Sequence, residues 1–421
     1  MKILLVNTFS TGGAAKACIR LHLGLLDRGI DSNLLLLVNS KENGIPKHEV
    51  FSQPSNFNTF FKRAIYKSKK ILKKYNLYFG LDNPSYLKGK ISEDYFSTPF
   101  SPFLINEHEL FKSSDIINLH WVAEFIDYKN FFKKSNKKII WTLHDMFAFT
   151  GGCHVSFGCN GFKEDCKNCP QLIGTLDNNY ASYLLEKKRR ALKNISDLTI
   201  VCPSRWLATE SSSSKIFKKF KHHVIPNGID GRIFKPSSKL LSRKNLNIPL
   251  DKKIVLFISD YLFRNGKGFF HLFKALEKLD DKNILIFAVG STQVKLYWEN
   301  LITFGTIKTE QEMAMAYSAA DVYVIPSFAE NLPNTAIESL LCGTPVIGFP
   351  VGGIVDIIQE GFNGFICKDT SVYSLAFKLN EFFKDNICFD KEAIREDAIK
   401  RFDIDVCTNN YINLYEKILD R

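Results

Sequence analysis

The chain has 421 residues, of which 45% are hydrophobic and 13% aromatic, which is enough for two domains with their own cores. The formal net charge of +12 suits nucleic acid, an anionic membrane surface or acidic small substrates as partners. No apolar run reaches the length of a membrane span. Residues 1–6 are apolar for only the length of a strand before polar residues follow, so we expect no signal peptide and a cytoplasmic protein.

The N-terminal residues predict a β-loop-α-β unit. Residues 2–6 read as a buried strand, residues 14–26 as a helix with apolar spacing, and residues 33–38 as the next strand. The loop between the first strand and the helix contains Gly12 and Gly13, which do not complete a dinucleotide-binding fingerprint. A tight turn that needs a positive φ explains this pair equally well. The pattern is typical of nucleotide-binding α/β domains.

A basic segment follows at residues 56–77, with apolar residues near helical spacing and no acid among its cations. Its cations are Lys62, Arg63, Lys67, Lys69, Lys70, Lys73 and Lys74. One interpretation is the solvated face of a core helix. The other is an amphipathic helix, over residues 60–77, that docks onto an anionic inner leaflet.

Two histidines follow predicted strands in the middle of the first half. Strands are predicted at 115–119 and 138–143, and His120 and His144 come directly after them. The carboxyl ends of parallel strands are where α/β proteins place their sites. A histidine at a strand end is often only a hydrogen-bonded structural residue, but two at neighbouring ends favour a functional role.

A cysteine-rich loop is predicted at residues 151–170, with glycines that supply its turns. It contains Cys153, Cys159, Cys166 and Cys169. The last pair has the Cys-x-x-Cys spacing that suits a tetrahedral metal, whereas the first pair is spaced more loosely. A structural zinc, with His154 able to replace one sulfur, is one interpretation; reduced thiols or a redox pair is the other.

A second α/β run begins after a polar stretch at 236–251, which we interpret as the linker. A strand is predicted at 254–259, followed by a loop at 260–268 that contains Arg264 and Lys267, and then by a helix at 269–279. Cations in such a strand-to-helix loop can neutralise a diphosphate, although a loop cation is usually only solvated.

The most informative stretch covers residues 327–353. It follows a strand predicted at 321–325, contains a helix at about 333–342, and leads through the strand at 345–349 to a glycine pair. Glu330 and Glu338 bracket the strand-to-helix junction. Each could be a simple charge that compensates the helix dipole. That interpretation explains neither the polar residues between the two carboxylates nor the glycine pair.

These features together resemble the retaining glycosyltransferases of family 4. Their donor motif is a Glu, seven residues and a second Glu, matched here by Glu330 and Glu338 within a similar surrounding sequence. The resemblance is strongest over 251–370 and weak over 40–115. It implies an α/β, GT-B fold, with two Rossmann-like domains that face an interdomain cleft. We expect an acceptor domain at 1–230, a nucleotide-sugar domain at 251–400, and a helix at 401–421 that crosses back to the first domain.

The resemblance also implies roles for individual residues. Glu330 holds sugar hydroxyls of the donor, Glu338 holds its ribose, and Lys267 neutralises the diphosphate. His144, with Asp145 beside it, lies near the reacting sugar. Arg264 departs from the family pattern, in which the arginine comes several residues earlier, so it acts from a different backbone position. The remaining donor-site residues are Gly12, Gly13, Asn331, Leu332, Pro333, Asn334 and Thr335.

The implied reaction moves a sugar from a nucleoside diphosphate sugar to a hydroxyl acceptor with retained configuration and without a catalytic cofactor. The basic segment points to a lipid-linked saccharide acceptor and to a peripheral position on the inner face of the plasma membrane, in cell-surface polysaccharide biosynthesis. We expect no nucleic-acid partner. The alternatives are a sugar-nucleotide epimerase and a non-catalytic sugar-nucleotide-binding protein on the same fold. A dehydrogenase fits least, because the dinucleotide fingerprint is incomplete.

Overall fold

A computed structural model describes residues 1–39, 44–52, 96–172, 179–293, 298–384, 387 and 389–420. The basic segment 60–77 lies outside these described residues. The chain divides into two compact units. Unit 1 comprises Met1–Ile225 together with Thr408–Arg421, and unit 2 comprises Pro226–Cys407.

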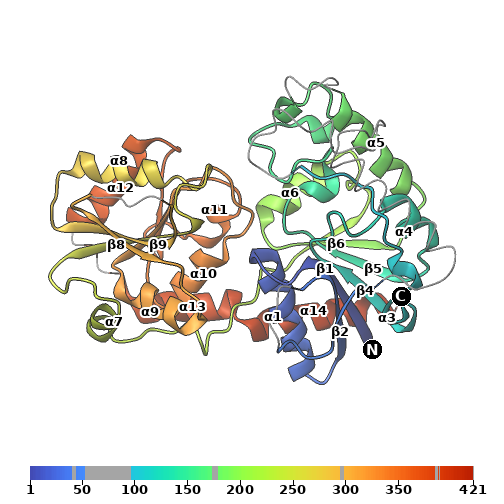
Figure 1. Cartoon of the computed structure of the whole chain (residues 1–421), viewed down its shortest axis with the longest axis horizontal. Helices are drawn as coiled ribbons and strands as arrows, with labels where there is room; N and C mark the ends of the chain where they lie inside the picture. The colour runs from blue at the N-terminus through green and yellow to red at the C-terminus, as the bar shows by residue number, and fades with distance from the viewer. Residues whose placement is uncertain are drawn as a thin grey trace. The chain divides into compact units, whose positions relative to one another are not determined.

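The described part of unit 1 is built on a seven-stranded parallel sheet (Figure 1). The strands are β1 (Lys2–Phe9), β2 (Asp31–Val38), β3 (His48–Val50), β4 (Ile116–Leu119), β5 (Lys138–Thr142), β6 (Leu198–Cys202) and β7 (Lys221–Val224). Their spatial order is β3-β2-β1-β4-β5-β6-β7, and every neighbouring pair is parallel. The carboxyl ends of β1, β4 and β5 therefore share one edge of this sheet.

Helices complete unit 1: α1 (Gly13–Asp27), α3 (Glu109–Ser113), α4 (Tyr128–Lys134), α5 (Tyr180–Leu192) and α6 (Arg205–Ser213). The predicted helix at 14–26 is thus confirmed within one residue at each end. The short 3-10 turns Phe147–Phe149, Gly161–Lys163 and Pro170–Leu172 shape the cysteine-rich loop.

Unit 2 has a six-stranded parallel sheet in its described part. The strands are β8 (Lys253–Tyr261), β9 (Ile284–Ser291), β10 (Leu301–Gly305), β11 (Val322–Ile325), β12 (Val346–Gly348) and β13 (Gly364–Ile366), in the order β10-β9-β8-β11-β12-β13. The helices are α7 (Lys239–Asn245), α8 (Phe269–Leu279), α9 (Glu310–Ala319), α10 (Asn334–Leu341), α11 (Ile354–Ile357), α12 (Val372–Lys384) and α13 (Lys391–Phe402).

The central strand β8 shows why helices cover both faces of this sheet. Ile254 and Leu256 join a core with residues of α9, α10 and α13. Val255 and Phe257, which alternate with them, join a second core with residues of α8 and α12. Successive side chains of a strand point to opposite faces, so an almost continuously apolar strand needs helices on both sides. Figure 1 shows α8 and α12 together on one side of this sheet and α9 and α13 on the other.

The stretch interpreted as a linker, 236–251, is structured and belongs to unit 2. It contains α7, whose Arg243 is 4% exposed and donates to the Ala319 carbonyl and to Asp321. Lys239 pairs with the same carboxylate. One charged residue of this stretch, Arg243, is therefore buried in an ion pair, and the boundary between units falls earlier, between Ile225 and Pro226.

The architecture confirms the fold expected from the sequence: two α/β units, each with a parallel Rossmann-like sheet. No helix in the described ranges is both long and apolar enough to cross a membrane.

The final helix α14 (Ile404–Leu419) begins in unit 2 and belongs to unit 1 from Thr408 onward, as the crossover expectation requires. Within unit 1 it is held by buried polar contacts. Tyr415 Oη accepts a hydrogen bond from Asn118 Nδ2 at 2.8 Å, and Tyr411 Oη lies 3.0 Å from Thr142 Oγ1. These contacts tie the end of the chain to β4 and β5.

We predict that Tyr415→Phe lowers the free energy of unfolding by about 1–3 kcal/mol, because it leaves the buried Asn118 amide without its acceptor. Chemical denaturation measures the change. Tyr373→Phe removes a hydroxyl from a side chain that is 73% exposed and serves as the control. Equal stability of the two variants would contradict this account of how α14 is held.

Candidate active site

Three loops meet at the carboxyl edge of the unit 2 sheet. They follow the neighbouring strands β8, β11 and β12 and contain Lys267, Glu330 and the glycine pair 352–353, respectively. Lys267 Nζ lies 2.6 Å from Glu330 Oε1. The side chain of Lys267 is 31% exposed and that of Glu330 is 13% exposed. The two residues singled out for the diphosphate and for the sugar are thus brought together, 63 residues apart in the sequence.

Two glycines allow these loops to approach so closely. Gly268 has φ 73°, and a Cβ there would lie 1.9 Å from the Pro326 carbonyl oxygen. Gly352 has φ 54°, and a Cβ there would lie 1.6 Å from the carbonyl oxygen of Glu330 itself. Only glycine fits where a positive φ and a close backbone contact coincide. The glycine pair therefore supports the Glu330 backbone. The interpretation of the two carboxylates as helix-dipole charges had left this pair unexplained.

Backbone hydrogen bonds lock the same three loops together. The Phe328 amide donates to the Gly266 carbonyl at 2.8 Å, and the Gly353 amide donates to the Asn331 carbonyl at 2.7 Å. The position of the Lys267–Glu330 pair is therefore set by main-chain contacts as well as by its own attraction.

Two helices that start at this edge, α8 and α10, have open N-termini. Gly268 precedes α8 and Pro333 precedes α10; neither supplies a side-chain cap, and neither helix has an acid in its first turn. By contrast, Thr309 and Asp390 cap α9 and α13 with their side chains. Uncapped amides and the positive end of the helix dipole favour an anionic group. This arrangement can bind a phosphate beside Lys267.

Glu338 lies in the middle of α10 and is 5% exposed. Its Oε2 accepts a hydrogen bond from Tyr317 Oη at 3.1 Å. Burial, together with the nearby Glu338, raises the pKa of Tyr317 well above its usual value, so this hydroxyl stays protonated and donates. Sequence reasoning missed Tyr317, because it lies 21 residues before Glu338 on another helix.

The other donor-motif residues surround this pair of carboxylates. Asn331 and Thr335 are partly exposed, whereas Leu332 is 7% exposed. Thr335 Oγ1 accepts from Tyr323 Oη at 2.8 Å, and Asn334 Oδ1 accepts from Asn227 Nδ2 at 2.9 Å.

Arg264 has a carboxylate partner of its own, Asp260. Its Nη1 lies 2.8 Å from Asp260 Oδ2, and the Arg264 side chain is 39% exposed. Exposed pairs of this kind are weak, so Arg264 can exchange partners. Its role at a diphosphate stays a prediction.

The candidate residues of unit 1 gather at the corresponding edge of its own sheet. Gly12, with φ 97°, precedes α1 after β1, and a Cβ there would meet nothing within 4 Å. His120 follows β4 directly, and His144 follows β5 after one intervening residue. The ring nitrogens His120 Nδ1 and His144 Nε2 are 2.9 Å apart, and the two rings are stacked. The sequence therefore identified both strand ends, but not this contact.

Asp145 points into a separate network. Its Oδ2 lies 2.6 Å from His154 Nδ1 and accepts from Trp121 Nε1 at 2.6 Å, while Oδ1 accepts from the Phe147 amide. Burial opposes ionisation of this carboxyl, but His154 and these donors outweigh burial and lower the pKa of Asp145. His154 Nε2 bonds Ser97 Oγ at 3.0 Å. Both nitrogens of His154 thus have protein partners in this arrangement. Its replacement of a cysteine as a metal ligand stays a prediction.

The four cysteines of the loop 151–170 line one cavity of about 20 Å³. Burial raises the pKa of Cys153 to about 11 and that of Cys166 to about 12, so these thiols are neutral as arranged. Within the described residues, no group of three or more His, Cys, Asp or Glu side chains is placed to hold a metal ion. A structural zinc here stays a prediction.

The buried Lys188 of α5 anchors the start of this loop. Its Nζ donates to the carbonyls of Phe147 and Thr150 and lies 3.7 Å from the centre of the Phe147 ring. Burial lowers the pKa of Lys188 to about 7. The Lys188 side chain therefore fixes the start of the loop that follows His144 and Asp145.

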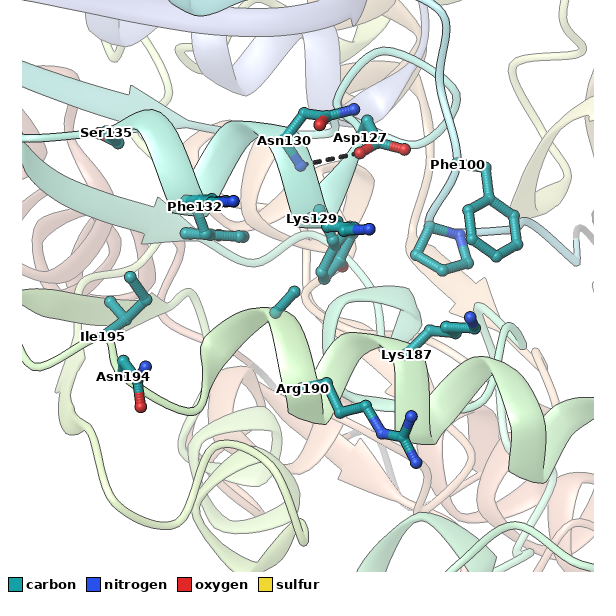
Figure 2. A pocket seen from close by; sticks show the side chains of 14 residues that line it. Phe100, Asp127, Lys129, Asn130, Phe132, Ser135, Lys187, Arg190, Asn194 and Ile195 are labelled. Atoms are coloured by element: carbon teal, nitrogen blue, oxygen red, sulfur yellow. Dashed lines mark hydrogen bonds between the residues drawn. The ribbon is translucent and has the colours of Figure 1, made fainter.

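A separate groove of about 890 Å³ lies between α4 and α5 (Figure 2). Lys129 projects into it from α4, and Lys187 and Arg190 from α5. Arg190 is paired with Glu186, and Asp127 caps α4 through the Asn130 amide. None of the site residues predicted from the sequence lines this groove.

Comparisons with known proteins show which proteins this chain is similar to. Residues 238–401 match the family model "Glycosyl transferases group 1". A relative in Escherichia coli strain K12, the putative colanic acid biosynthesis glycosyl transferase WcaC, is 25% identical over 86% of each chain. The putative teichuronic acid biosynthesis glycosyltransferase TuaC of Bacillus subtilis is 28% identical over 41% of this chain and 44% of its own.

Solved structures share the fold. The sucrose-phosphate synthase of Thermosynechococcus elongatus superposes with a TM-score of 0.68 at 17% identity, over 100% of this chain and 99% of that one. Anabaena Alr3699/HepE, solved in complex with UDP-glucose, has a TM-score of 0.66 at 15% identity, over 99% and 100% of the two chains. Together, these findings show a GT-B fold for the chain, whose residues 238–401 match the group 1 glycosyltransferases.

Proposed function

We propose that this glycosyltransferase is a retaining enzyme that moves a sugar from a nucleoside diphosphate sugar to a hydroxyl acceptor. The observation that carries the proposal is the Lys267–Glu330 pair, 2.6 Å apart, beside the uncapped starts of α8 and α10. A diphosphate needs a cation and free amides, and a sugar needs a hydrogen-bond acceptor for its hydroxyls. Lys267 supplies the cation, Glu330 supplies the acceptor, and the two side chains are in contact.

In the proposed reaction, the bond between the anomeric carbon and the diphosphate oxygen breaks. The acceptor oxygen bonds the anomeric carbon on the same face, and the acceptor proton passes to the leaving phosphate oxygen. Lys267 and the amides at the start of α8 and α10 stabilise the negative charge that develops on the leaving group. Glu330 binds sugar hydroxyls, Glu338 the ribose, and His144 the reacting sugar or its acceptor. This route requires no catalytic cofactor.

We place the reaction in the assembly of a cell-surface polysaccharide, on a lipid-linked saccharide acceptor. The names of WcaC and TuaC, which refer to colanic acid and teichuronic acid biosynthesis, support the process. The neighbour WaaG is described as a glycosyltransferase of lipopolysaccharide biosynthesis. The basic segment 60–77 is the proposed contact with an anionic inner leaflet.

Two other functions use the same site. An epimerase would release nucleotide without any acceptor, and a binding protein would hold the donor without turnover. Measuring nucleotide release with and without a saccharide acceptor separates them from a transferase. A screen of uridine and guanosine diphosphate sugars by thermal shift identifies the donor, because a ligand that binds the folded state raises its stability.

A structural zinc bound by Cys153, Cys159, Cys166 and Cys169 remains a proposal that accompanies this function. It would fix the loop after His144 and have no part in the chemistry. Elemental analysis of the purified protein decides between bound metal and free thiols.

We predict that Lys267→Ala lowers kcat by about a hundredfold to a thousandfold, because it removes one preorganised donor to the leaving group. Sugar transfer from the identified donor measures the change. Lys274→Ala, at an exposed position on the same helix α8, is the matched control and should leave kcat unchanged. Turnover by Lys267→Ala at the wild-type rate would remove Lys267 from the mechanism.

Gly352→Ala should displace the backbone of the donor site, because the added Cβ would meet the Glu330 carbonyl. We expect Gly352→Ala to lower the free energy of unfolding by more than the roughly 1–2 kcal/mol that a positive φ alone costs a side chain. We also expect the donor to raise the melting temperature of this variant less than that of the wild type. The matched control is Gly361→Ala, which also has a positive φ but open space around it. Thermal melting with and without donor compares the two; the same donor response in both variants would refute the supporting role of Gly352.

A further inference from the structure

The two histidines at the strand ends of unit 1 are not equivalent. His120 is 3% exposed, and its Nε2 is buried without a hydrogen-bond partner among the described residues. His144 is partly exposed. Their single hydrogen bond joins His120 Nδ1 to His144 Nε2. His120 therefore lies behind His144, and only His144 is placed to meet a ligand.

The neighbouring carboxylate does not hold His144. Asp145 uses one oxygen for His154 and Trp121 and the other for the Phe147 amide. In many sites a carboxylate orients a functional histidine through its second nitrogen. Here that position is taken by the neutral imidazole of His120.

The contact also selects a tautomer. If His144 donated to His120, the proton of His120 would lie on Nε2, and a buried N–H would be left unpaired, which proteins rarely tolerate. If His120 donates instead, its Nε2 carries no proton, and the proton of His144 lies on Nδ1. The second arrangement is favoured, and it leaves His144 with an N–H to donate to an oxygen atom.

Both rings stay neutral in this arrangement. Burial, and then His144, lowers the pKa of His120 well below its usual value, and burial lowers the pKa of His144 to about 4. A neutral His144 binds an oxygen as a hydrogen-bond donor, without bringing a positive charge to the reacting sugar.

We propose that His120 is a positioning residue for sugar transfer, which holds the ring plane of His144 and keeps its proton on Nδ1 so that Nδ1–H donates to the reacting sugar or its acceptor. This inference rests on the proposed function for the role of His144. It assigns to His120 no contact with substrate.

The test compares two substitutions of His120. The amide of Asn can place a donor near the position of the imidazole Nδ1, so His120→Asn can keep the bond to His144, whereas His120→Phe preserves the ring volume and removes the bond. We expect His120→Phe to lower kcat by about tenfold to a hundredfold, as small misplacements of a catalytic group do. The KM for the donor should change less than kcat, and His120→Asn should recover most of the loss.

A control separates positioning from stability. His22 is fully buried in unit 1, and its two ring nitrogens contact Ser32 Oγ and the Pro46 carbonyl. His22→Phe should lower the melting temperature but should not lower kcat as His120→Phe does. Assays are run well below the melting temperature of each variant, so that kcat refers to folded enzyme.

A second measurement does not depend on activity. Nitrogen-15 NMR of histidine-labelled protein, without substrate, reports which nitrogen of His144 carries the proton. We expect Nδ1–H in the wild type and in His120→Asn, and a shift toward Nε2–H in His120→Phe. An unchanged tautomer in His120→Phe, or an unchanged kcat, overturns the proposal. If no donor is turned over by the wild type, the proposed function fails, and the NMR result alone decides whether His120 sets the tautomer.

Discussion

Two close backbone contacts in unit 2 are the constraint on which the proposed donor site depends. Gly268 packs against the Pro326 carbonyl and Gly352 against the Glu330 carbonyl, at distances that no side chain permits. These contacts bring the ends of β8, β11 and β12 together, and the Lys267–Glu330 ion pair forms where they meet. The pair is only partly exposed, so solvent screens it less than a surface pair. Without ligand, the two side chains satisfy each other.

This pairing suggests how the site works. In the proposed reaction, a diphosphate that binds Lys267 would release Glu330 to accept hydrogen bonds from the sugar. The candidate residues of unit 1 interact differently. Its strand ends bear neutral imidazoles supported by a buried network around Asp145, and Lys188 anchors the loop that follows. The cation proposed to bind the leaving group, Lys267, is thus in unit 2.

The sequence was sufficient for the parts of this protein that depend on local pattern. Apolar strands, the start of α10 and the glycine after it follow from short-range rules, and Gly343 has φ 70° at the predicted end of that helix. Glu330 and Lys267 could be singled out because the family resemblance gives each a place in a loop motif. Their direct contact could not be predicted, since it depends on how two strands pair.

The contacts that sequence reasoning missed share this property. Tyr317 meets Glu338 from another helix, and His154 meets Asp145 across a turn. Helix α7 was taken for a linker because its polar side chains resemble solvated ones, whereas Arg243 is buried against Asp321. In each case the role of a polar side chain depends on a partner outside its own motif, which composition and spacing do not reveal.

Titration calorimetry tests the central claim, that Lys267 binds the diphosphate of the donor and Glu330 binds its sugar. A nucleoside diphosphate and its sugar derivative are titrated into the wild type, Lys267→Met and Glu330→Gln. We predict that Lys267→Met weakens binding of both ligands. Glu330→Gln should weaken only the sugar derivative and should tighten the bare diphosphate, because Lys267 loses its competing carboxylate. If Glu330→Gln changed both affinities equally, or Lys267→Met changed neither, the account would be contradicted.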